Sequence, residues 1–352
     1  MAKTKSIKIG VIGAGGIAAK LHLPELKKLS GVEITVIGGR KTSRLETICR
    51  LFDVPRWTHS YEEILDDPSI DAILIALPHP LHVPWGLKAL QAGKHVFMEK
   101  PLCISMEEAD AFVTAVENSD RIVLALPFTD LPEIIATSNL IAEGKLGRVS
   151  SAHARASHGG PEHYYQEIQE LLEEEPVKDL WFFDADRAGA GALFDMGVYA
   201  IANLVATLGA VRRVSCFQAT VDKPATVEDT AAMLLEFENS AIATVETGWC
   251  DGARTRTFSI HGSAGKLFYS EDNKHLDYYT PGIRSKSGLC QKSIDLSKLP
   301  RVSPHKHWID CINRNSPPAR SNARTARHIT EIMLAGLESA KLGEALKIKT
   351  RL

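Results

Sequence analysis

The sequence predicts an α/β protein. A doubly wound parallel sheet, residues 1–126, is expected to precede a C-terminal α+β domain, residues 127–352, with a large, mostly antiparallel and open-faced sheet. A glycine-rich loop follows the first apolar segment, strands and helices then alternate as far as residue 126, and strand-like segments succeed one another later. Alternation is typical of parallel sheets with right-handed crossovers, and successive strands are typical of antiparallel sheets.

The first strand and its loop predict a dinucleotide site. Ile7–Ile12 has the pattern of a buried strand, and the G-x-G-x-x-A sequence of residues 13–18 opens an amphipathic helix that extends to about Leu29. Such glycines let backbone N–H groups approach a pyrophosphate at a helix N-terminus, as in a Rossmann domain. A glycine turn in some other α/β protein is the alternative. The residues expected to bind the cofactor here are Gly13, Gly15, Gly16 and Ile17.

The end of the second strand, Glu33–Ile37, indicates which dinucleotide binds. NAD-dependent enzymes usually place an Asp or Glu here, which accepts a hydrogen bond from the ribose 2′-hydroxyl. This chain instead has Gly38-Gly39-Arg40-Lys41-Thr42-Ser43-Arg44. Because a 2′-phosphate needs cations and is repelled by a carboxylate, we expect NADP(H) to be preferred and to contact Arg40, with NAD(H) as the second choice. The alternative is that Arg40 and Arg44 are solvated charges at the start of a helix.

Further side chains are expected at the same edge of the parallel sheet. Strands are predicted at 71–76, 95–98 and 121–126, with helices at 81–92 and 105–117. Ligands bind outside the carboxyl ends of parallel strands, so Lys100, just after a strand and before a proline, is the first candidate for a catalytic residue. For His82, an ordinary histidine at the start of a helix is an equal alternative. The candidate cofactor contacts at this edge are Ala76, Leu77, Pro78, His82, Glu99 and Lys100.

The second domain is expected to begin with a helix at 131–143. The strand-like segments that follow are 149–156, 211–221, 231–237, 241–247, 255–261 and 266–269. A large sheet with one uncovered face often buries that face in another subunit, so we expect a homodimer or homotetramer formed through it. The last helix, about 323–341, is expected to be able to pack back on the first domain. The acidic segment 167–175 is interpreted as a solvated helix face or loop without a chemical role.

A second group of candidate residues lies in the glycine-rich segment 189–203. Asp195, Tyr199 and Asn203 are four residues apart, so they form one polar stripe on an otherwise apolar helix. Buried polar groups need partners. We expect this stripe to face a substrate, and hydrogen bonding within the core is the alternative.

These residue types suit hydride transfer at a secondary alcohol or carbonyl carbon. That reaction needs a proton donor or acceptor at the substrate oxygen, and positive charge where alkoxide character develops. A phenol is a poor base at neutral pH, and a nearby ammonium favours its phenolate form. We therefore expect Lys100 and Tyr199 to act together, with Tyr199 as the proton carrier and Asp195 orienting the substrate or the lysine.

Five segments carry a recognisable combination of motifs. They are residues 13–18, Ala76-Leu77-Pro78-His79-Pro80-Leu81-His82, residues 92–102 with the E-K-P motif, residues 189–199, and the terminal helix with Glu338-Ser339-Ala340. This combination resembles the Gfo/Idh/MocA family of NAD(P)-dependent oxidoreductases over nearly the whole chain. The resemblance implies a Rossmann domain joined to an open-sheet α/β domain, an active site between them, catalysis by Lys100 and assistance by Asp195.

The chain departs from part of that family at Tyr199, where inositol dehydrogenase-like members have a histidine. A tyrosine there is similar to the glucose-fructose oxidoreductase, dihydrodiol dehydrogenase and xylose dehydrogenase branch, which commonly uses NADP(H). Ala190 within the usual triple glycine and His79 in place of asparagine are milder departures. The preferred interpretation is an NADP(H)-dependent oxidoreductase for a sugar, sugar derivative or polyol. The alternatives are a non-catalytic NAD(P)-sensing regulator and a redox-neutral NAD(P)-dependent glycosidase.

The composition excludes several other classes of protein. The chain has 352 residues, of which 44% are hydrophobic and 24% charged, and a net charge of −2 gives no basic patch for nucleic acid. It shows neither a secretory signal nor an apolar run of the roughly 20 residues that a membrane span needs. We therefore expect a cytoplasmic protein without nucleic-acid or membrane partners. Its six cysteines have no metal-like spacing, so neither a disulfide nor a metal site is predicted.

Overall fold

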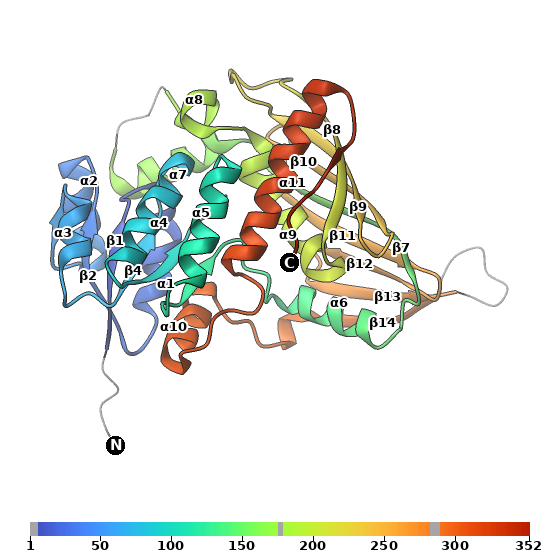
Figure 1. The fold of residues 1–352 in the computed structure, drawn as a ribbon, viewed down its shortest axis with the longest axis horizontal. Coiled ribbons are helices and arrows are strands. Elements are labelled where there is room, and N and C mark those ends of the chain that lie inside the picture. Colours follow the sequence, from blue (N-terminus) through green and yellow to red (C-terminus); the bar gives the residue numbers. More distant parts are fainter. Residues whose placement is uncertain (1–5, 175–178, 282–288) are drawn as a thin grey trace.

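The computed structural model describes residues 6–174, 179–281 and 289–352. Residues 1–5, in which no signal segment was expected, lie outside these ranges. Two sheets stand side by side, and the long helix α11 (Ala323–Leu342) runs between them (Figure 1). The predicted fold class is confirmed, because one sheet is parallel and the other is mostly antiparallel.

Within the described residues, the first sheet has six parallel strands in the order β3-β2-β1-β4-β5-β6. The strands are β1 (Ile7–Ile12), β2 (Val32–Gly38), β3 (Trp57–Thr58), β4 (Ala72–Ile75), β5 (His95–Met98) and β6 (Val123–Ala125). The strand order reverses between β1 and β4, and in open sheets of this kind a ligand binds at the carboxyl ends beside that reversal.

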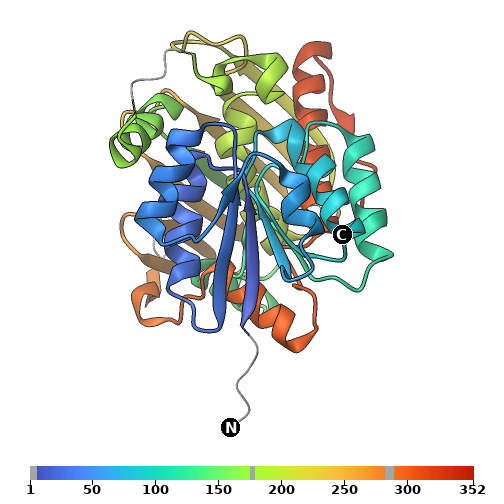
Figure 2. The same ribbon diagram turned by 90° about the vertical axis from the view of Figure 1, so that its left-hand side faces the viewer.

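Helices cover both faces of the parallel sheet (Figure 2). On one face α1 (Leu23–Lys27) and α2 (Thr42–Phe52) pack on inward side chains of β1, and on the other face pack α3 (Tyr61–Asp66), α4 (His82–Gln91) and α5 (Met106–Glu117). Ser60 and Ser105 cap α3 and α5, each accepting a hydrogen bond from the backbone N–H of a glutamate three residues later. This S-x-x-E pattern defines where these helices begin.

Two later segments also contribute to the core of the first domain. Ile168 and Leu172 of α7 (Pro161–Leu172) and Trp308 of α10 (Pro304–Arg314) are buried with the side chains of α1 and α2. By sequence position α10 falls in the predicted second domain, residues 127–352. Its buried residues instead belong to the core of the first domain, where Trp308 packs against Phe97.

The second sheet has nine strands within the described residues, in the order β14-β13-β12-β11-β7-β10-β9-β8-β15. Only β7 and β10 among these neighbours are parallel. The strands are β7 (Val149–Ser157), β8 (Val211–Ala219), β9 (Thr230–Phe237), β10 (Ile242–Gly248), β11 (Thr255–Gly262), β12 (Lys266–Ser270), β13 (His275–Thr280), β14 (Leu289–Asp295) and β15 (Leu346–Lys347).

The sequence analysis missed β13, β14 and β15 in this sheet. Along β13 only Leu276 is buried, so the alternation of buried and exposed residues that marks a strand is weak there. β15 has two residues and pairs with β8 at the opposite edge. A two-residue edge strand of this kind is held mainly by backbone hydrogen bonds, and the pattern of apolar and polar side chains in the sequence does not reveal these bonds.

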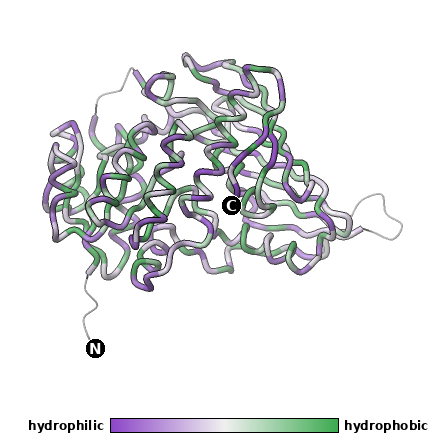
Figure 3. Tube along the Cα trace, viewed as in Figure 1, coloured by the Kyte–Doolittle hydropathy of each residue, from purple (hydrophilic) through white to green (hydrophobic). Residues whose placement is uncertain are grey.

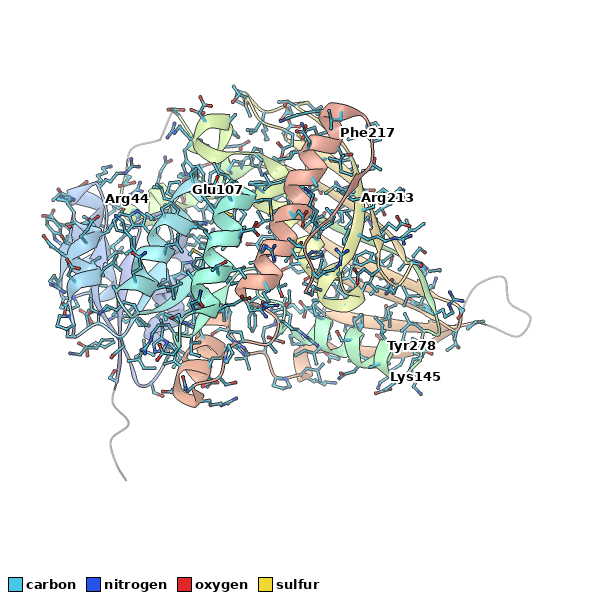
Figure 4. The ribbon with its side chains drawn as sticks, in the orientation of Figure 1. Arg44, Glu107, Lys145, Arg213, Phe217 and Tyr278 are labelled. Atoms are coloured by element: carbon cyan, nitrogen blue, oxygen red, sulfur yellow. The ribbon has the colours of Figure 1, made fainter. Side chains whose placement is uncertain are left out.

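In the part of the chain that the structure describes, helices cover one face of the second sheet and leave the other open. α6 (Pro132–Ala142), α9 (Val198–Leu208) and α11 pack on the inner face. The outer face exposes Phe217, Leu234, Ile242 and Phe268, and Phe217 of β8 is labelled in Figure 4. The open face that the sequence predicts is therefore present.

The helical run Ala185–Leu208 is long and apolar enough, by length and composition, to cross a membrane. However, 78% of its most apolar window is buried inside the protein, as is common for a helix of a protein core. The outer helices instead alternate hydrophobic and hydrophilic stretches (Figure 3), as amphipathic packing requires.

Candidate active site

The glycine loop after β1 has the geometry that a dinucleotide pyrophosphate needs. Gly13 has a φ of +109°, and a Cβ there would lie 2.2 Å from the carbonyl oxygen of Ala76, so only glycine fits. Leu77 also borders this position, and Gly15 has more room. Gly16 begins the helix that continues through Ile17, so the loop presents backbone N–H groups at a helix N-terminus. The loop therefore fits the cofactor that the sequence predicts.

The helix after this loop is shorter and less regular than predicted. It contains a π-helical turn at Ala18–His22 before α1, and it ends at Lys27 instead of near Leu29. Pro24 cannot donate the backbone hydrogen bond of a regular turn, which favours the wide turn before it. This turn directs His22 into the core, where its side chain is fully buried.

His22 connects α10 to the residues that follow β5. Its Nε2 lies 2.9 Å from Oε1 of Glu99, and its Nδ1 lies 2.8 Å from Nε2 of His305. Burial alone would raise the pKa of Glu99, but His22 and the charge of Lys100 bring it to about 2, so Glu99 is ionised. Burial lowers the pKa of His305 to about 3, so its ring is neutral. One set of protons satisfies both contacts: His305 donates to His22, and His22 donates to Glu99.

Lys100 lies at the junction of the two domains, immediately after Glu99. The Glu99 carboxylate accepts its backbone N–H at 2.8 Å. Its ammonium donates to the backbone oxygen of Asp195 at 2.7 Å and to Oδ1 of Asp195 at 2.8 Å. The candidate lysine and the candidate aspartate, 95 residues apart in the chain, are therefore directly bonded.

The other carboxylate oxygen of Asp195 also has partners. Trp249 donates its indole N–H to Oδ2 at 3.0 Å, and His158 Nε2 lies 3.1 Å from the same atom. The backbone N–H of Gly160 donates to Nδ1 of His158, so the ring proton is on Nε2 and points at Asp195. With both oxygens engaged, Asp195 holds Lys100 in place and is poorly placed to accept a proton from a substrate.

Lys100 and Asp195 each stabilise the charged form of the other. Burial lowers the pKa of Lys100, but the carboxylate of Asp195 outweighs that effect and raises the pKa above its ordinary value. Burial raises the pKa of Asp195, and the ammonium of Lys100 brings it well below its usual range. Lys100 is consequently a hydrogen-bond donor and a source of positive charge at neutral pH, and it is not a base.

Tyr199 lies beside two cations. Nζ of Lys100 is 5.1 Å from the centre of its ring, and the guanidinium carbon of Arg256 is 4.2 Å away. In the described residues no hydrogen bond joins Lys100 to the Tyr199 hydroxyl, so the ammonium faces the ring. Among the described residues, no side-chain hydrogen bond joins Asn203, the third residue of the predicted stripe, to this group. The structure thus brings Lys100, Asp195 and Tyr199 together and leaves Asn203 outside.

The glycine-rich segment before Asp195 fits closely against the residues that precede β9. A Cβ on Gly191 would lie 1.9 Å from the backbone oxygen of Glu228. The Glu228 carboxylate accepts the backbone N–H groups of Gly191 and Leu193, each at 3.0 Å. These bonds fix the start of a second π-helical turn, Leu193–Gly197, which carries Asp195.

The remaining candidates occupy different surroundings. His82 is 1% exposed, and both ring nitrogens lie 2.7 Å from carbonyl oxygens, those of Pro101 and Leu77. Neither nitrogen is free to hydrogen-bond a ligand, and a contact between His82 and the cofactor stays a prediction. Pro78 precedes a short turn at the end of β4. Arg40 is exposed after β2 and forms no ion pair within the described ranges.

Sequence analysis missed His22, Trp249 and Arg256, and it favoured a surface position for His158 over one in the cleft. His158 and Trp249 directly follow β7 and β10, which are parallel neighbours with Ser157 opposite Gly248. The rule that active residues follow the carboxyl ends of parallel strands would have identified both, had the parallel pair been recognised inside the antiparallel sheet.

The fold and this site together define a dinucleotide-binding oxidoreductase whose candidate reactive lysine lies between the two domains. A family model described as "Oxidoreductase family, NAD-binding Rossmann fold" matches residues 7–126, and one described as "GFO/IDH/MocA C-terminal domain" matches residues 134–268. These matches cover more than half of the chain, and the protein belongs to the Gfo/Idh/MocA family of oxidoreductases.

Individual relatives agree with this assignment. An uncharacterized oxidoreductase of Rhizobium meliloti, ORF334, is 32% identical over 197 residues, which cover 56% of this chain and 54% of that relative. The D-xylose 1-dehydrogenase (NADP(+)) 2 of Haloferax volcanii is 29% identical over 260 residues, 73% of this chain and 74% of that protein. A levoglucosan dehydrogenase in complex with NADH and levoglucosan has a TM-score of 0.83 at 21% identity, covering 98% of this chain and 100% of that one. This last similarity establishes the fold alone.

Replacement of Gly13 by alanine should disrupt the loop. The added Cβ meets a backbone oxygen in a conformation that alanine rarely adopts, so we expect a loss of at least about 2 kcal/mol in the free energy of unfolding. Urea denaturation at 25 °C measures it. Gly252→Ala is the control, since nothing lies within 4 Å of that Cβ, and it should change stability by less than about 0.5 kcal/mol. Equal midpoints for the two variants would show that the loop does not require glycine.

His305→Phe should change how stability depends on pH. The pKa of His305 is about 3 in the folded chain and about 6.5 in the unfolded chain, so below pH 6.5 unfolding takes up a proton. The stabilisation that the folded chain gains from a neutral His305 is therefore complete above pH 6.5 and is lost as the pH falls. The variant keeps a ring against Phe97, and it leaves His22 without a donor. We expect lower stability at pH 7.5 but a slope at pH 5 that is shallower by about 1.4 kcal/mol per pH unit. Urea denaturation at pH 7.5, 6 and 5 measures both, and parallel profiles would contradict the assignment.

Proposed function

We propose that the protein is an NADP(H)-dependent oxidoreductase that interconverts a secondary alcohol and a carbonyl on a sugar, sugar derivative or polyol. The observation that carries this proposal is the buried bond between Lys100 and Asp195 beside Tyr199, at the carboxyl ends of β4 and β5. Xylose and levoglucosan dehydrogenases among the similar proteins support a carbohydrate substrate.

Lys100 has one hydrogen left for a substrate. An ammonium has three N–H donors, and two of them bind the backbone and side chain of Asp195. The third can donate to the substrate oxygen and stabilise the negative charge that develops there. Because Asp195 is itself held by Trp249 and His158, the direction of that donor is fixed before substrate binds.

Tyr199 is proposed to carry the proton of the substrate hydroxyl. Its ring lies beside Lys100 and Arg256, so it borders the ammonium that is proposed to bind the substrate oxygen. When bound, the nicotinamide cofactor supplies the acceptor or donor of hydride. The residues of this chain then orient the substrate oxygen and move its proton.

The preference for NADP(H) rests on the segment after β2. No acid stands among residues 38–44 directly after that strand, and Arg40, Lys41 and Arg44 lie within this segment. The name of the Haloferax volcanii relative includes NADP(+), which supports the same choice. A cytoplasmic location completes the proposal, because the five cysteines whose side chains are described are all free; Cys290 lies outside that set.

We also propose a homodimer or homotetramer formed through the open face of the second sheet. Phe217 of β8 is 81% exposed, Leu234 of β9 is 49% exposed and Ile242 of β10 is 49% exposed. The strand register makes Leu234 a diagonal neighbour of both of the others, so the three form one apolar patch on adjacent strands. Burial of such a patch against the same patch of a second copy is favourable and self-complementary.

Lys100→Met and Tyr199→Phe test the chemistry. Each should lower kcat by at least about 100-fold at saturating cofactor, because each removes a group that acts on the substrate oxygen. Steady-state assays of NADPH formation or consumption over a sugar panel measure it, with NADPH binding followed separately by fluorescence. Lys88→Met is the matched control, since Lys88 is exposed and pairs with Glu62.

Two results would overturn the chemical assignment. Intact turnover in either variant would remove Lys100 or Tyr199 from the mechanism. Tight NADPH binding by the unaltered protein without turnover of any sugar would favour a sensing role instead.

The double variant Phe217→Asp, Leu234→Asp tests the assembly. Two carboxylates in the patch should prevent its burial, so the particle should become a monomer when light scattering is measured after size-exclusion chromatography. Ile135→Asp, at an exposed apolar residue of α6, should leave the molar mass unchanged. A monomeric unaltered protein at micromolar concentration would contradict the proposal.

A further inference from the structure

The acidic end of α7 makes ion pairs with cations of the first domain. Glu167 pairs with Lys20, Glu173 lies 3.4 Å from Arg50, and Glu174 pairs with Arg44 and Lys41. The sequence analysis interpreted this segment as a solvated face without a chemical role. For Glu174 that interpretation is wrong, because its side chain is only 5% exposed. Glu175, the last residue of the predicted segment, lies outside the described residues.

Glu174 binds Arg44 through both carboxylate oxygens. Oε1 accepts from Nε of Arg44 at 2.9 Å, and Oε2 accepts from Nη2. Nζ of Lys41 lies 3.1 Å from Oε1. Burial raises the pKa of Glu174, but these two cations lower it below its ordinary value, so the carboxylate is charged. An arginine fork binds a phosphate in the same two-pronged way as it binds a carboxylate.

The cations that bind Glu174 lie where dinucleotide-binding proteins distinguish NAD(H) from NADP(H). Lys41 immediately precedes α2 and Arg44 lies in its first turn, a few residues after β2. The residues after this strand contact the 2′ position of the adenosine ribose. Arg44, labelled in Figure 4, faces the end of α7 from the first domain. The carboxylate of Glu174 therefore binds Arg44 and Lys41, the cations that a 2′-phosphate would bind.

Glu174 is held in this position by its own helix. Ile168 of α7 packs over Gly16 at the start of the cofactor helix, and Leu172 is 1% exposed. Glu173 ends the helix in a left-handed conformation, with a φ of 55°. The backbone N–H of Glu174 then donates to the oxygen of Gln169 at 2.9 Å. The carboxylate is thus fixed by backbone bonds as well as by its ion pairs.

We propose that Glu174 is a cofactor-specificity residue that competes with the 2′-phosphate of NADP(H) for Arg44 and Lys41. NADP(H) must displace the carboxylate to reach these cations, whereas NAD(H), with a neutral 2′-hydroxyl, leaves the ion pairs in place. Glu174 therefore reduces the preference for NADP(H) over NAD(H) that Arg44 and Lys41 alone would give. The inference rests on the proposed dinucleotide site at the end of β2.

Glu174→Gln in the full chain tests this competition, with Glu173→Gln as the matched control. The control changes the same charge at the adjacent residue, whose pair with Arg50 is exposed. The probes are adenosine 2′,5′-bisphosphate and 5′-AMP, which differ only in the 2′-phosphate, titrated by calorimetry at constant ionic strength. Glu174→Gln should bind the bisphosphate about tenfold more tightly and 5′-AMP within twofold of the unaltered protein. The control should change neither affinity.

A second pair of variants covers the case in which Glu174→Gln alters the local fold. Arg44→Gln should lower the affinity for the bisphosphate. Adding Glu174→Gln to this variant should raise that affinity by less than half of the increase seen in the unaltered background, because the cation for which Glu174 competes has been removed. Thermal unfolding of each variant checks that the chain is folded. A full gain in the double variant would overturn the proposal.

Other outcomes also count against the inference. Unchanged affinity for the bisphosphate in Glu174→Gln would show that no competition exists. Weaker binding of 5′-AMP in that variant would show that Glu174 instead binds the ribose hydroxyls directly. If neither the probes nor NADPH and NADH bind the unaltered protein, the proposed dinucleotide site fails; if they bind and Glu174→Gln has no effect, only the role of Glu174 fails.

Discussion

The bond between Lys100 and Asp195 is the constraint on which the arrangement of the site depends. Both groups are largely buried, and removing either would leave an unpaired charge, which is far more costly than the pair itself. The pair joins the end of β5 to the helix that begins the inner layer of the second domain. It also fixes which partner gives up a proton, because an ammonium bonded to a carboxylate is a donor. Tyr199, Trp249 and His158 are arranged around this bond.

Two π-helical turns direct side chains to consecutive residues of the E-K-P motif. The turn Ala18–His22 brings His22 to Glu99, and the turn Leu193–Gly197 brings Asp195 to Lys100. A π turn contains one residue more than the α-helical repeat allows, so it changes which side chains face the core, and such turns are frequent at functional sites. Glu99 is ionised and is bonded both to His22 and to the backbone of Lys100. It therefore links the helix after the glycine loop to the lysine.

The fold and the three central residues could be predicted because each leaves a local signal. Alternation of strands and helices marks the first domain, and Lys100, Asp195 and Tyr199 lie in short motifs. His22, Arg256 and Glu174 could not be predicted, because their roles depend on partners at least 57 residues away, which no periodicity encodes. Glu174 shows the difficulty most clearly: a glutamate among glutamates has the pattern of a solvated helix, and only the position of Arg44 gives it a specific partner.

Helix α11 is fastened to both halves of the molecule. Arg327 pairs with Asp110 of α5, while His328 accepts the backbone N–H of Val211 and Ser339 Oγ accepts that of Cys216, both in β8. A swing of one half against the other would pull this helix away from one set of partners. These contacts oppose hinge bending between the two sheets. We therefore expect a nucleotide to enter and leave through small local displacements, so that little of its binding energy is used to move one half of the molecule against the other.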